Sequence, residues 1–298
     1  MFRALSIPTP LFVAVDTRAG LDRAIAEIGL PAMLKTRTMG YDGKGQAVLR
    51  GSQDLECAWM RLGGTPLILE GLVPFDRELS VIAVRGRNGQ TAFYPLAQSS
   101  HHEGILRLSL SRPDDPMESL AQEYARRLLD ALDYVGVLTL ELFQVGDTLI
   151  ANEMAPRVHN SGHWTIEGAE TSQFENHLRA ILGMPLGDTS PAGYAAMVNF
   201  IGTLPETAQV LAIPGAHLHA YGKQPRPGRK LGHATVQAQD EQAMRNGISA
   251  LLALATPACS IEFYDEVLAR WSKTSSLPSA RTRSMKARAT TDTCLPTG

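Results

Sequence analysis

The sequence lacks the features that would mark a membrane, secreted or nucleic-acid-binding protein. Its three cysteines, Cys57, Cys259 and Cys294, are odd in number and far apart, so they predict free thiols in a reducing cytoplasm rather than a disulfide framework or a zinc site. No apolar run reaches the roughly 18 residues that a membrane-spanning helix needs. The formal net charge of -2 gives no reason to expect nucleic acid or an acidic membrane as a partner.

What is present is typical of a globular protein, with 44% hydrophobic and 19% charged residues among 298. Predicted β-hairpins, which turn at Asn88-Gly89 and at Gly146-Asp147, are mixed with predicted helices at about 117–132 and 240–254. Strands and helices do not alternate regularly. This pattern predicts an α+β fold with largely antiparallel sheets.

Two glutamates interrupt apolar strands on either side of the second turn. Glu141 lies in Leu138-Thr139-Leu140-Glu141-Leu142-Phe143, and Glu153 follows Leu149-Ile150-Ala151-Asn152. A hairpin turning at Gly146-Asp147 places residue 141 opposite residue 152 or 153. Facing carboxylates repel unless a divalent cation lies between them, and Mg²⁺ favours one or two carboxylates plus phosphates. A sheet face open to water would also tolerate both acids, so both interpretations stay open.

A glycine-rich loop separates predicted strands at 32–35 and 47–49. It runs Met39-Gly40-Tyr41-Asp42-Gly43-Lys44-Gly45-Gln46. Its glycines would let backbone N–H groups approach phosphate oxygens, and Lys35 and Lys44 would add positive charge. It is neither a Walker loop nor a dinucleotide fingerprint, and an ordinary flexible turn remains the alternative.

The segment after the next strand has the character of an adenine site. Glu70, Gly71, Leu72 and Val73 offer backbone polar groups and apolar cover between two strands, and Glu78 would accept hydrogen bonds from ribose hydroxyls. Taken singly, Glu70 and Glu78 also fit ordinary surface charges.

Two polar segments complete the pattern. Directly after Glu153, Arg157 offers a planar fork for an anion, and His159 and Asn160 would orient a small oxyanion such as bicarbonate. Further on, residues 223–233 form a basic turn stiffened by Pro and Gly, with four cationic side chains within eight residues, which suits a phosphate monoester. A hydrogen-bonded loop and a solvated charge run are the respective alternatives.

Together these motifs resemble a known family. Lys35 with the glycine loop, Asn152-Glu153-Met154-Ala155-Pro156-Arg157-Val158-His159-Asn160-Ser161-Gly162-His163-Trp164-Thr165, and Arg226-Pro227-Gly228-Arg229-Lys230-Leu231-Gly232-His233 resemble the 5-(carboxyamino)imidazole ribonucleotide synthetases. These are the ATPase subunits of phosphoribosylaminoimidazole carboxylase, in the ATP-grasp superfamily. The resemblance covers about residues 5–255, and its second motif is the most specific.

The resemblance implies ATP and Mg²⁺ as cofactors, with roles that fall on matching residues. The ATP-binding residues would be Lys35, Gly40, Tyr41, Asp42, Gly43, Lys44, Gly45, Gln46, Glu70, Gly71, Leu72, Val73, Glu78, His101, Asn152 and Glu153. Glu141 and Glu153 would bind Mg²⁺. Arg157, His159 and Asn160 would serve bicarbonate and carboxyphosphate, and Tyr41, Asp42, Lys223, Arg229 and Lys230 would hold the aminoimidazole ribonucleotide.

The implied organisation is an ATP-grasp domain at residues 1–190, with a lid subdomain at about 12–75, then a β-rich subdomain at 191–256. Residues 257–298, rich in Ser, Thr, Arg and Lys, are predicted to be a disordered tail. The N-terminal lobe with which family members begin is expected to be absent. An inert nucleotide-binding remnant, or a ligase for another phosphorylated amine, is therefore the alternative to an active enzyme, and a homodimer is compatible with either.

Overall fold

The computed structural model describes residues 1–38 and 44–255, which fold as two compact units. The larger unit contains residues 1–11, Lys44 and residues 72–255, and the smaller unit contains residues 12–38 and 45–71. The predicted tail lies outside the described residues. Among the described residues, no helix is both long and apolar enough to cross a membrane.

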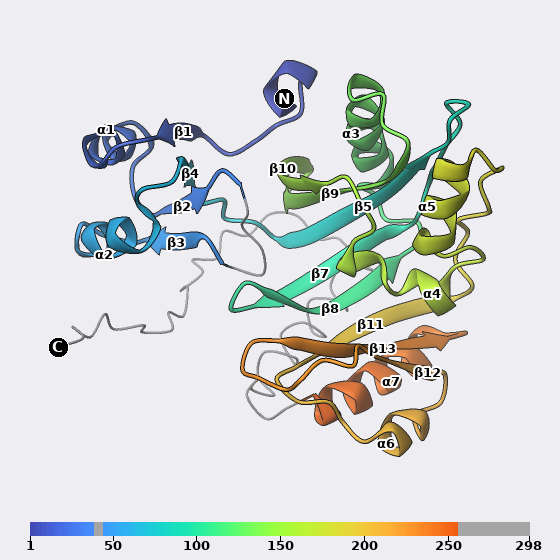
Figure 1. Cartoon of the computed structure of the whole chain (residues 1–298). Coiled ribbons are helices and arrows are strands. Elements are labelled where there is room, and N and C mark those ends of the chain that lie inside the picture. The colour runs from blue at the N-terminus through green and yellow to red at the C-terminus, as the bar shows by residue number, and fades with distance from the viewer. Residues whose placement is uncertain (39–43, 256–298) are drawn as a thin grey trace. The chain divides into compact units, whose positions relative to one another are not determined.

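The smaller unit is a four-stranded antiparallel sheet with two helices (Figure 1). In sheet order its strands are β1 (Phe12–Val15), β4 (Leu67–Gly71), β2 (Ala32–Thr36) and β3 (Gln46–Leu49), and its helices are α1 (Arg18–Ile28) and α2 (Gln53–Leu62). The Thr17 side chain caps α1 by accepting the Gly20 N–H at 3.0 Å. Leu21, Leu34, Leu62 and Leu69 meet in one buried core.

The larger unit is built on a nine-stranded sheet. Figure 1 shows the main path of the sheet: β10 (Thr148–Ala155), β9 (Gly136–Val145), β5 (Arg77–Arg85), β7 (Leu96–His102), β8 (Ile105–Arg112), β11 (Tyr194–Ile201), β13 (Lys230–Ala238) and β12 (Ala216–Ala220). A further strand, β6 (Thr91–Phe93), pairs with β5 off this path. Every strand pair in both sheets is antiparallel, which confirms the predicted α+β class.

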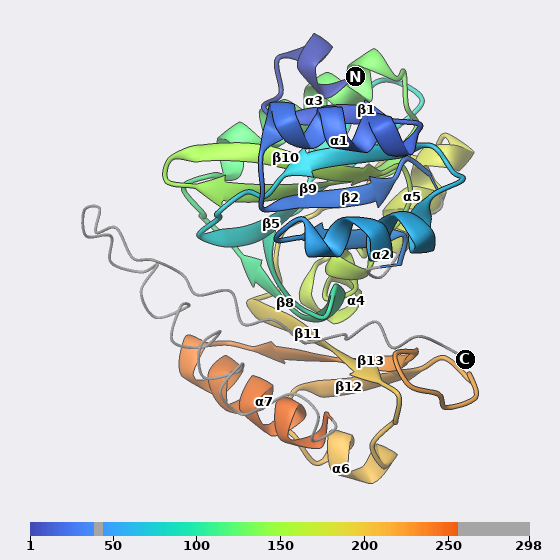
Figure 2. The ribbon, with the colours of Figure 1, turned by 90° about the vertical axis from the view of Figure 1, so that its left-hand side faces the viewer.

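Helices cover both faces of this sheet. They are η1 (Phe2–Leu5), α3 (Glu118–Ala131), η2 (Asn160–Gly162), α4 (Thr165–Gly168), α5 (Gln173–Leu182), α6 (Thr207–Leu211) and α7 (Glu241–Leu254). Residues that alternate along β5 divide between the faces: Val81 packs in the α3 core, whereas Ile82 packs with Trp164 and α5. α7 lies along β11 and β13 (Figure 2).

The structure differs from the sequence prediction at several elements. Lys230 begins β13, so residues 230–233 of the predicted basic turn belong to a strand. The β7–β8 hairpin was not predicted, because buried polar residues such as Ser99 and Ser109 break its apolar alternation. Helix α2 was also missed, although Asp54 accepts the Arg50 N–H just before it.

One buried ion pair ties the start of β5 to the segment before α3. The Arg77 guanidinium donates to both oxygens of Asp115, at 2.5 and 2.8 Å, and to Gln144 Oε1 at 2.6 Å. The Asp115 side chain is fully buried and also accepts the Met117 N–H at 3.0 Å. Both of its carboxylate oxygens are directed at fixed neighbours, as a buried charge requires.

Asp115→Asn is expected to lower the free energy of unfolding by about 3–5 kcal/mol, because the Arg77 charge would remain buried without its counter-charge. Denaturant unfolding measures this loss. Glu175→Gln is the control, since Glu175 pairs with Arg179 at 2.6 Å on the surface, where such a pair contributes about 1 kcal/mol or less. Equal losses in the two variants would contradict the assignment.

A histidine stack (His163, His219 and His233) joins α4 and the loop before it to β12 and β13. The His233 ring lies 4.7 Å from that of His163 and 4.5 Å from that of His219. His219 Nε2 lies 2.8 Å from Glu167 Oε1, and the Tyr221 hydroxyl lies 2.7 Å from His233 Nδ1. Burial, followed by neighbouring positive groups, lowers the pKa of His163 to about 4 and that of His233 to about 2.

Because both pKa values lie below the ordinary 6.5, the unfolded chain binds more protons than the folded chain as the pH falls. Stability from the neutral rings is complete above pH 6.5 and is lost toward pH 4 and below. For each proton that the unfolded chain binds in excess, the free energy of unfolding falls by up to about 1.4 kcal/mol per pH unit as the pH is lowered. His163→Gln is therefore expected to make the fall in urea midpoint between pH 6.5 and 4 shallower, and an unchanged slope would contradict this.

Candidate active site

The two glutamates singled out from the sequence meet on the β9–β10 hairpin. Glu141 and Glu153 are Cα partners, so their side chains share one face of the sheet, as predicted. A register shift between Ala151 and Glu153 places Asn152 at an irregularity beside them. Burial, and then the charge of Glu153, raises the pKa of Glu141 to about 7. A cation between the two carboxylates would relieve that repulsion, so the pair fits a divalent metal.

The pair would leave most of a metal's coordination to other ligands. Across the described residues, no group of three or more His, Cys, Asp or Glu side chains has the arrangement of a metal site. Mg²⁺ commonly keeps several waters and phosphate oxygens and takes only one or two protein carboxylates. The geometry therefore suits a metal that arrives with a nucleotide better than a permanently bound structural ion.

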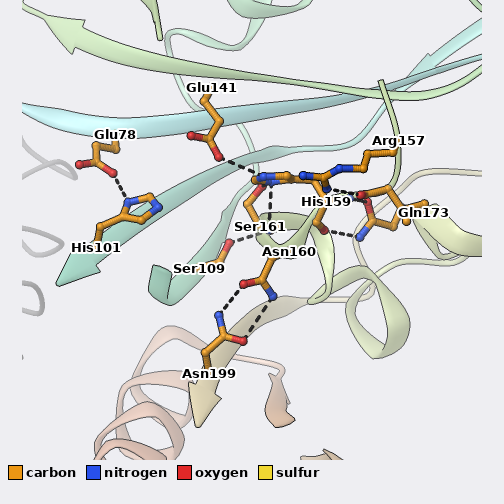
Figure 3. A network of polar contacts seen from close by, with 11 residues as sticks. Glu78, His101, Ser109, Glu141, Arg157, His159, Asn160, Ser161, Gln173 and Asn199 are labelled. Atoms are coloured by element: carbon orange, nitrogen blue, oxygen red, sulfur yellow. Dashed lines mark hydrogen bonds and ion pairs between the residues drawn. The ribbon is translucent and has the colours of Figure 1, made fainter. Parts of the chain in front are cut away.

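His159 faces this acid pair as a neutral hydrogen-bond donor. Its Nδ1 accepts the Ser161 backbone N–H at 3.3 Å, and the Ser161 hydroxyl lies 2.8 Å from the same atom (Figure 3). A backbone N–H can only donate, so Nδ1 is unprotonated and the proton lies on Nε2, which is 3.2 Å from Glu141 Oε1. Burial, with the charges of Arg157 and Lys230, lowers the pKa of His159 to about 3.

A second acid–histidine pair lies on the same sheet. Glu78 of β5 and His101 of β7 are in close ion-pair contact through Glu78 Oε2 and His101 Nδ1 (Figure 3). Burial lowers the pKa of His101, but the hydrogen bond to Glu78 and its charge outweigh this, and the net shift is upward. Glu141 adds to the rise, so the two acid–histidine pairs influence each other electrostatically.

Sequence reasoning missed the residues that hold the loop carrying His159 and Asn160. Gln173 is fully buried; its amide accepts the His159 N–H at 3.0 Å and donates to the His159 carbonyl at 2.6 Å. The Ser109 hydroxyl donates to the Ser161 carbonyl at 2.7 Å, and the Asn160 and Asn199 amides pair with each other (Figure 3). The one signal in the sequence is Asn199 itself, a polar residue inside the apolar run Met197-Val198-Asn199-Phe200-Ile201.

The loop is closely packed at Gly162. A Cβ added at Gly162 would lie 2.7 Å from Gln173 Oε1 and 2.7 Å from Ile82 Cδ1. Arg157, by contrast, is exposed and donates to the Val158 carbonyl at 2.9 Å. The structure thus brings Arg157, His159 and Asn160 together on one short segment, from which His159 contacts Glu141.

In the smaller unit, two of the predicted ATP-binding residues form an ion pair. Lys35 Nζ of β2 lies 2.7 Å from Glu70 Oε2 of β4, and both side chains are partly buried. Gly45 has a φ of 77°, a conformation that favours glycine, and Gln46 begins β3. Lys44 precedes them, whereas Gly40, Tyr41, Asp42 and Gly43 lie outside the described residues. Gly71 ends β4; Leu72 and Val73 follow it in the larger unit.

The cations predicted to bind the substrate phosphate differ in how strongly they act on the acid pair. Lys230 lies close enough to the acids to lower the pKa of Glu141 electrostatically, and it lowers the pKa of His159 and His163 as well. Arg229 is partly buried and donates to the Gln224 carbonyl at 3.3 Å, and Lys223 lies over the Tyr221 ring at 4.9 Å. Of the three cations, Lys230 therefore contributes most to the field around Glu141 and His159.

Comparison with known proteins gives a consistent result. The ATP-grasp domain model matches residues 1–174, and the phosphoribosylaminoimidazole carboxylase C-terminal domain model matches residues 195–247. The N5-carboxyaminoimidazole ribonucleotide synthase of Pseudomonas aeruginosa is 56% identical over 254 residues, which cover 85% of this chain and 71% of that protein.

Solved structures agree. The N5-carboxyaminoimidazole ribonucleotide synthetase of Thermus thermophilus superposes with a TM-score of 0.80 at 55% identity, covering 86% of this chain and 70% of that one. The Aspergillus clavatus synthase, solved with ADP and 5-aminoimidazole ribonucleotide, has a TM-score of 0.78 at 33% identity, covering 85% and 70%.

The matched region covers most of this chain but only part of the length of each relative. The chain spans 71% of the Pseudomonas aeruginosa protein, 62% of that of Vibrio vulnificus and 72% of that of Escherichia coli. The identity and the two family models nevertheless extend over both the acid hairpin and the strand that begins at Lys230. The chain belongs to the ATP-grasp superfamily and, within it, to the N5-carboxyaminoimidazole ribonucleotide synthase family of ATP-dependent ligases.

Proposed function

We propose that this chain catalyses the ATP-dependent carboxylation of 5-aminoimidazole ribonucleotide with bicarbonate, which gives N5-carboxyaminoimidazole ribonucleotide for purine biosynthesis in the cytoplasm. The observation that carries the proposal is the facing pair Glu141 and Glu153 with the neutral His159 beside it. Family membership supplies the substrate class. The Aspergillus clavatus relative was solved with ADP and 5-aminoimidazole ribonucleotide, the nucleotide product and the amine substrate that the proposal needs.

In this proposal Glu141, Glu153 and Asn152 hold Mg²⁺ with the ATP phosphates. When bound, the ion neutralises the charge that accumulates on the phosphates during transfer. As the family resemblance implies, we assign Lys35, Lys44 and the glycine loop to phosphate binding, and the segment from Glu70 to Val73, with Glu78, to adenosine binding. The Lys35–Glu70 ion pair supports this assignment, because it fixes the lysine at the strand end that leads to the loop.

The proposed reaction has two steps. A bicarbonate oxygen attacks the γ-phosphorus of ATP, the bond to the β-phosphate oxygen breaks, and ADP and carboxyphosphate form. The amine nitrogen then bonds to the carboxyl carbon, the carbon–oxygen bond to phosphate breaks, and the amine loses a proton as phosphate leaves. Arg157 and Lys230 provide positive charge for bicarbonate and for carboxyphosphate. Holding the reactants in the right positions accounts for much of the rate.

The role of His159 in this scheme differs from that expected from the sequence. Its Nδ1 is occupied by Ser161 and its Nε2 carries the proton. With a pKa lowered to about 3, it is neutral at physiological pH and acts as a hydrogen-bond donor. We assign it to orienting the Glu141 carboxylate by donating from Nε2.

The proposal is tested by ATP turnover in the purified chain. Release of phosphate that needs both bicarbonate and 5-aminoimidazole ribonucleotide supports it. Nucleotide binding without such turnover would instead favour the second candidate, an inert nucleotide-binding remnant. Turnover with a different phosphorylated amine in place of the ribonucleotide would identify another ligase.

Glu153→Gln and Glu141→Gln are each expected to lower Mg²⁺-dependent turnover by roughly a hundredfold or more, because each removes a carboxylate at the point where phosphate charge develops. Steady-state phosphate release at varied Mg²⁺ measures the loss. Glu175→Gln changes a surface carboxylate of α5 and serves as the control. Full activity in either site variant would refute the metal assignment.

A further inference from the structure

Two asparagines meet side by side where the loop that carries His159 enters η2. Asn199 Nδ2 donates to Asn160 Oδ1 at 2.7 Å, and Asn160 Nδ2 donates back to Asn199 Oδ1 at 3.3 Å (Figure 3). Asn199 is 2% exposed and lies in the middle of β11, whereas Asn160 begins η2 and is only partly buried. A reciprocal amide pair of this kind fixes both planes at once.

A backbone carbonyl fixes the orientation of the amide oxygen and nitrogen atoms in this pair. Asn199 Nδ2 also donates to the Leu106 carbonyl at 3.0 Å. A carbonyl oxygen can only accept, so the Asn199 nitrogen must face Leu106 and its oxygen must face Asn160. The orientation of the Asn160 amide follows from that of Asn199, and it does not depend on any ligand.

The remaining hydrogen of the Asn160 amide is also engaged. Asn160 Nδ2 lies 3.0 Å from His163 Nδ1, which must therefore accept. His163 is thus expected to carry its single proton on Nε2. Both hydrogens of Asn160 are then committed, to Asn199 and His163, while Oδ1 keeps one unassigned lone pair among the described residues.

We propose that Asn199 is a positioning residue for the carboxylation reaction: it sets the Asn160 side chain so that its only open function is to accept a hydrogen bond from a substrate donor. This deepens the proposed function and rests on it for its kinetic part. Both candidate substrates offer such a donor: the ribonucleotide has an amine N–H, and bicarbonate has a hydroxyl O–H. Asn160 is consequently not an oxyanion donor, which differs from the role expected from the sequence.

The orientation is tested first in the unmodified protein, without any turnover. Long-range ¹H–¹⁵N spectra of ¹⁵N-histidine-labelled chain report which imidazole nitrogen carries the proton, and His163→Gln assigns the His163 signals. We expect His163 as the Nε2–H tautomer at pH 7. The Nδ1–H tautomer would mean that the Asn160 amide is reversed and would overturn the proposal.

The positioning role is tested with Asn199→Asp, which keeps the shape of the side chain but removes both Nδ2 hydrogen bonds. The Asn160 oxygen would then face a carboxylate oxygen, and we expect His163 to lose its single fixed tautomer. Asn176→Asp is the matched control, because Asn176 is equally buried and donates to the Tyr94 hydroxyl at 2.8 Å and to the Gly187 carbonyl at 3.2 Å, with no contact to Asn160. An unchanged His163 spectrum in Asn199→Asp would overturn the proposal.

Kinetics identify the substrate donor. Asn199→Asp is expected to lower kcat/KM by roughly tenfold or more, the usual cost of one misdirected hydrogen bond, with the KM for ATP unchanged. A rise in the KM for the ribonucleotide points to the amine, and a rise in the KM for bicarbonate points to the hydroxyl. If neither KM rises, or if Asn176→Asp gives the same changes, the role is structural and the proposal fails.

The two proposals fail in distinguishable ways. Absence of turnover in the unmodified chain counts against the proposed function, and the imidazole spectrum still decides the orientation of Asn160. A folded, active chain with the Nδ1–H tautomer of His163 would leave the proposed function standing and refute the role of Asn199. If Asn199→Asp does not fold, the spectrum of the unmodified chain remains the deciding measurement.

Discussion

Two negative charges on neighbouring strands are the constraint on which the site depends. Glu141 and Glu153 occupy partner positions, and the pKa of Glu141 rises to about 7 because burial and its neighbour both oppose ionisation. A sheet selected for stability alone would not place two carboxylates there, since like charges opposite each other weaken it. The surrounding groups partly offset this repulsion: His159 donates a hydrogen bond to Glu141, and Lys230 and His101 contribute positive potential.

The buried polar residues on this face of the sheet serve the same arrangement. Ser109, Gln173 and Asn199 each bond to the backbone or amide of residues 159–161, so the short segment that leads into η2 is tied to β8, α5 and β11. Each of these residues would be costly in a core if left unpaired. Their presence follows from the need to hold a loop of polar side chains beside two acids.

The acid pair could be predicted from the sequence because the apolar runs and the turn that joins them lie close together along the chain. Glu141 and Glu153 interrupt apolar runs, and the turn at Gly146-Asp147 sets which residues face each other. The shift beside Asn152 could not be predicted, since one extra residue in a strand leaves no mark in the apolar pattern. The antiparallel α+β class followed from the hairpins in the same way.

The support of the loop could not be predicted, because its partners are distant in sequence. Asn160 and Asn199 lie 39 residues apart and Ser109 and Ser161 lie 52 apart, and neither separation corresponds to a helical or strand period. Gln173 follows Ser172, the cap of α5, and resembles an ordinary first-turn residue. The hairpin of β7 and β8 was missed for a related reason: Ser109 bonds to the Ser161 carbonyl, a partner that reaches it only in the folded chain.

The position of Lys230 at the start of a strand has a consequence for how the site responds to ligands. A cation on a free turn can swing toward an anion when it arrives and away when it leaves. Lys230 instead begins β13 as the Cα partner of Ile201 in β11, and from Gly232 onward the same strand pairs with both β11 and β12, so its backbone is held at the start of a paired strand. The backbone that carries its charge is therefore a standing part of the electrostatic background, already present before any substrate enters.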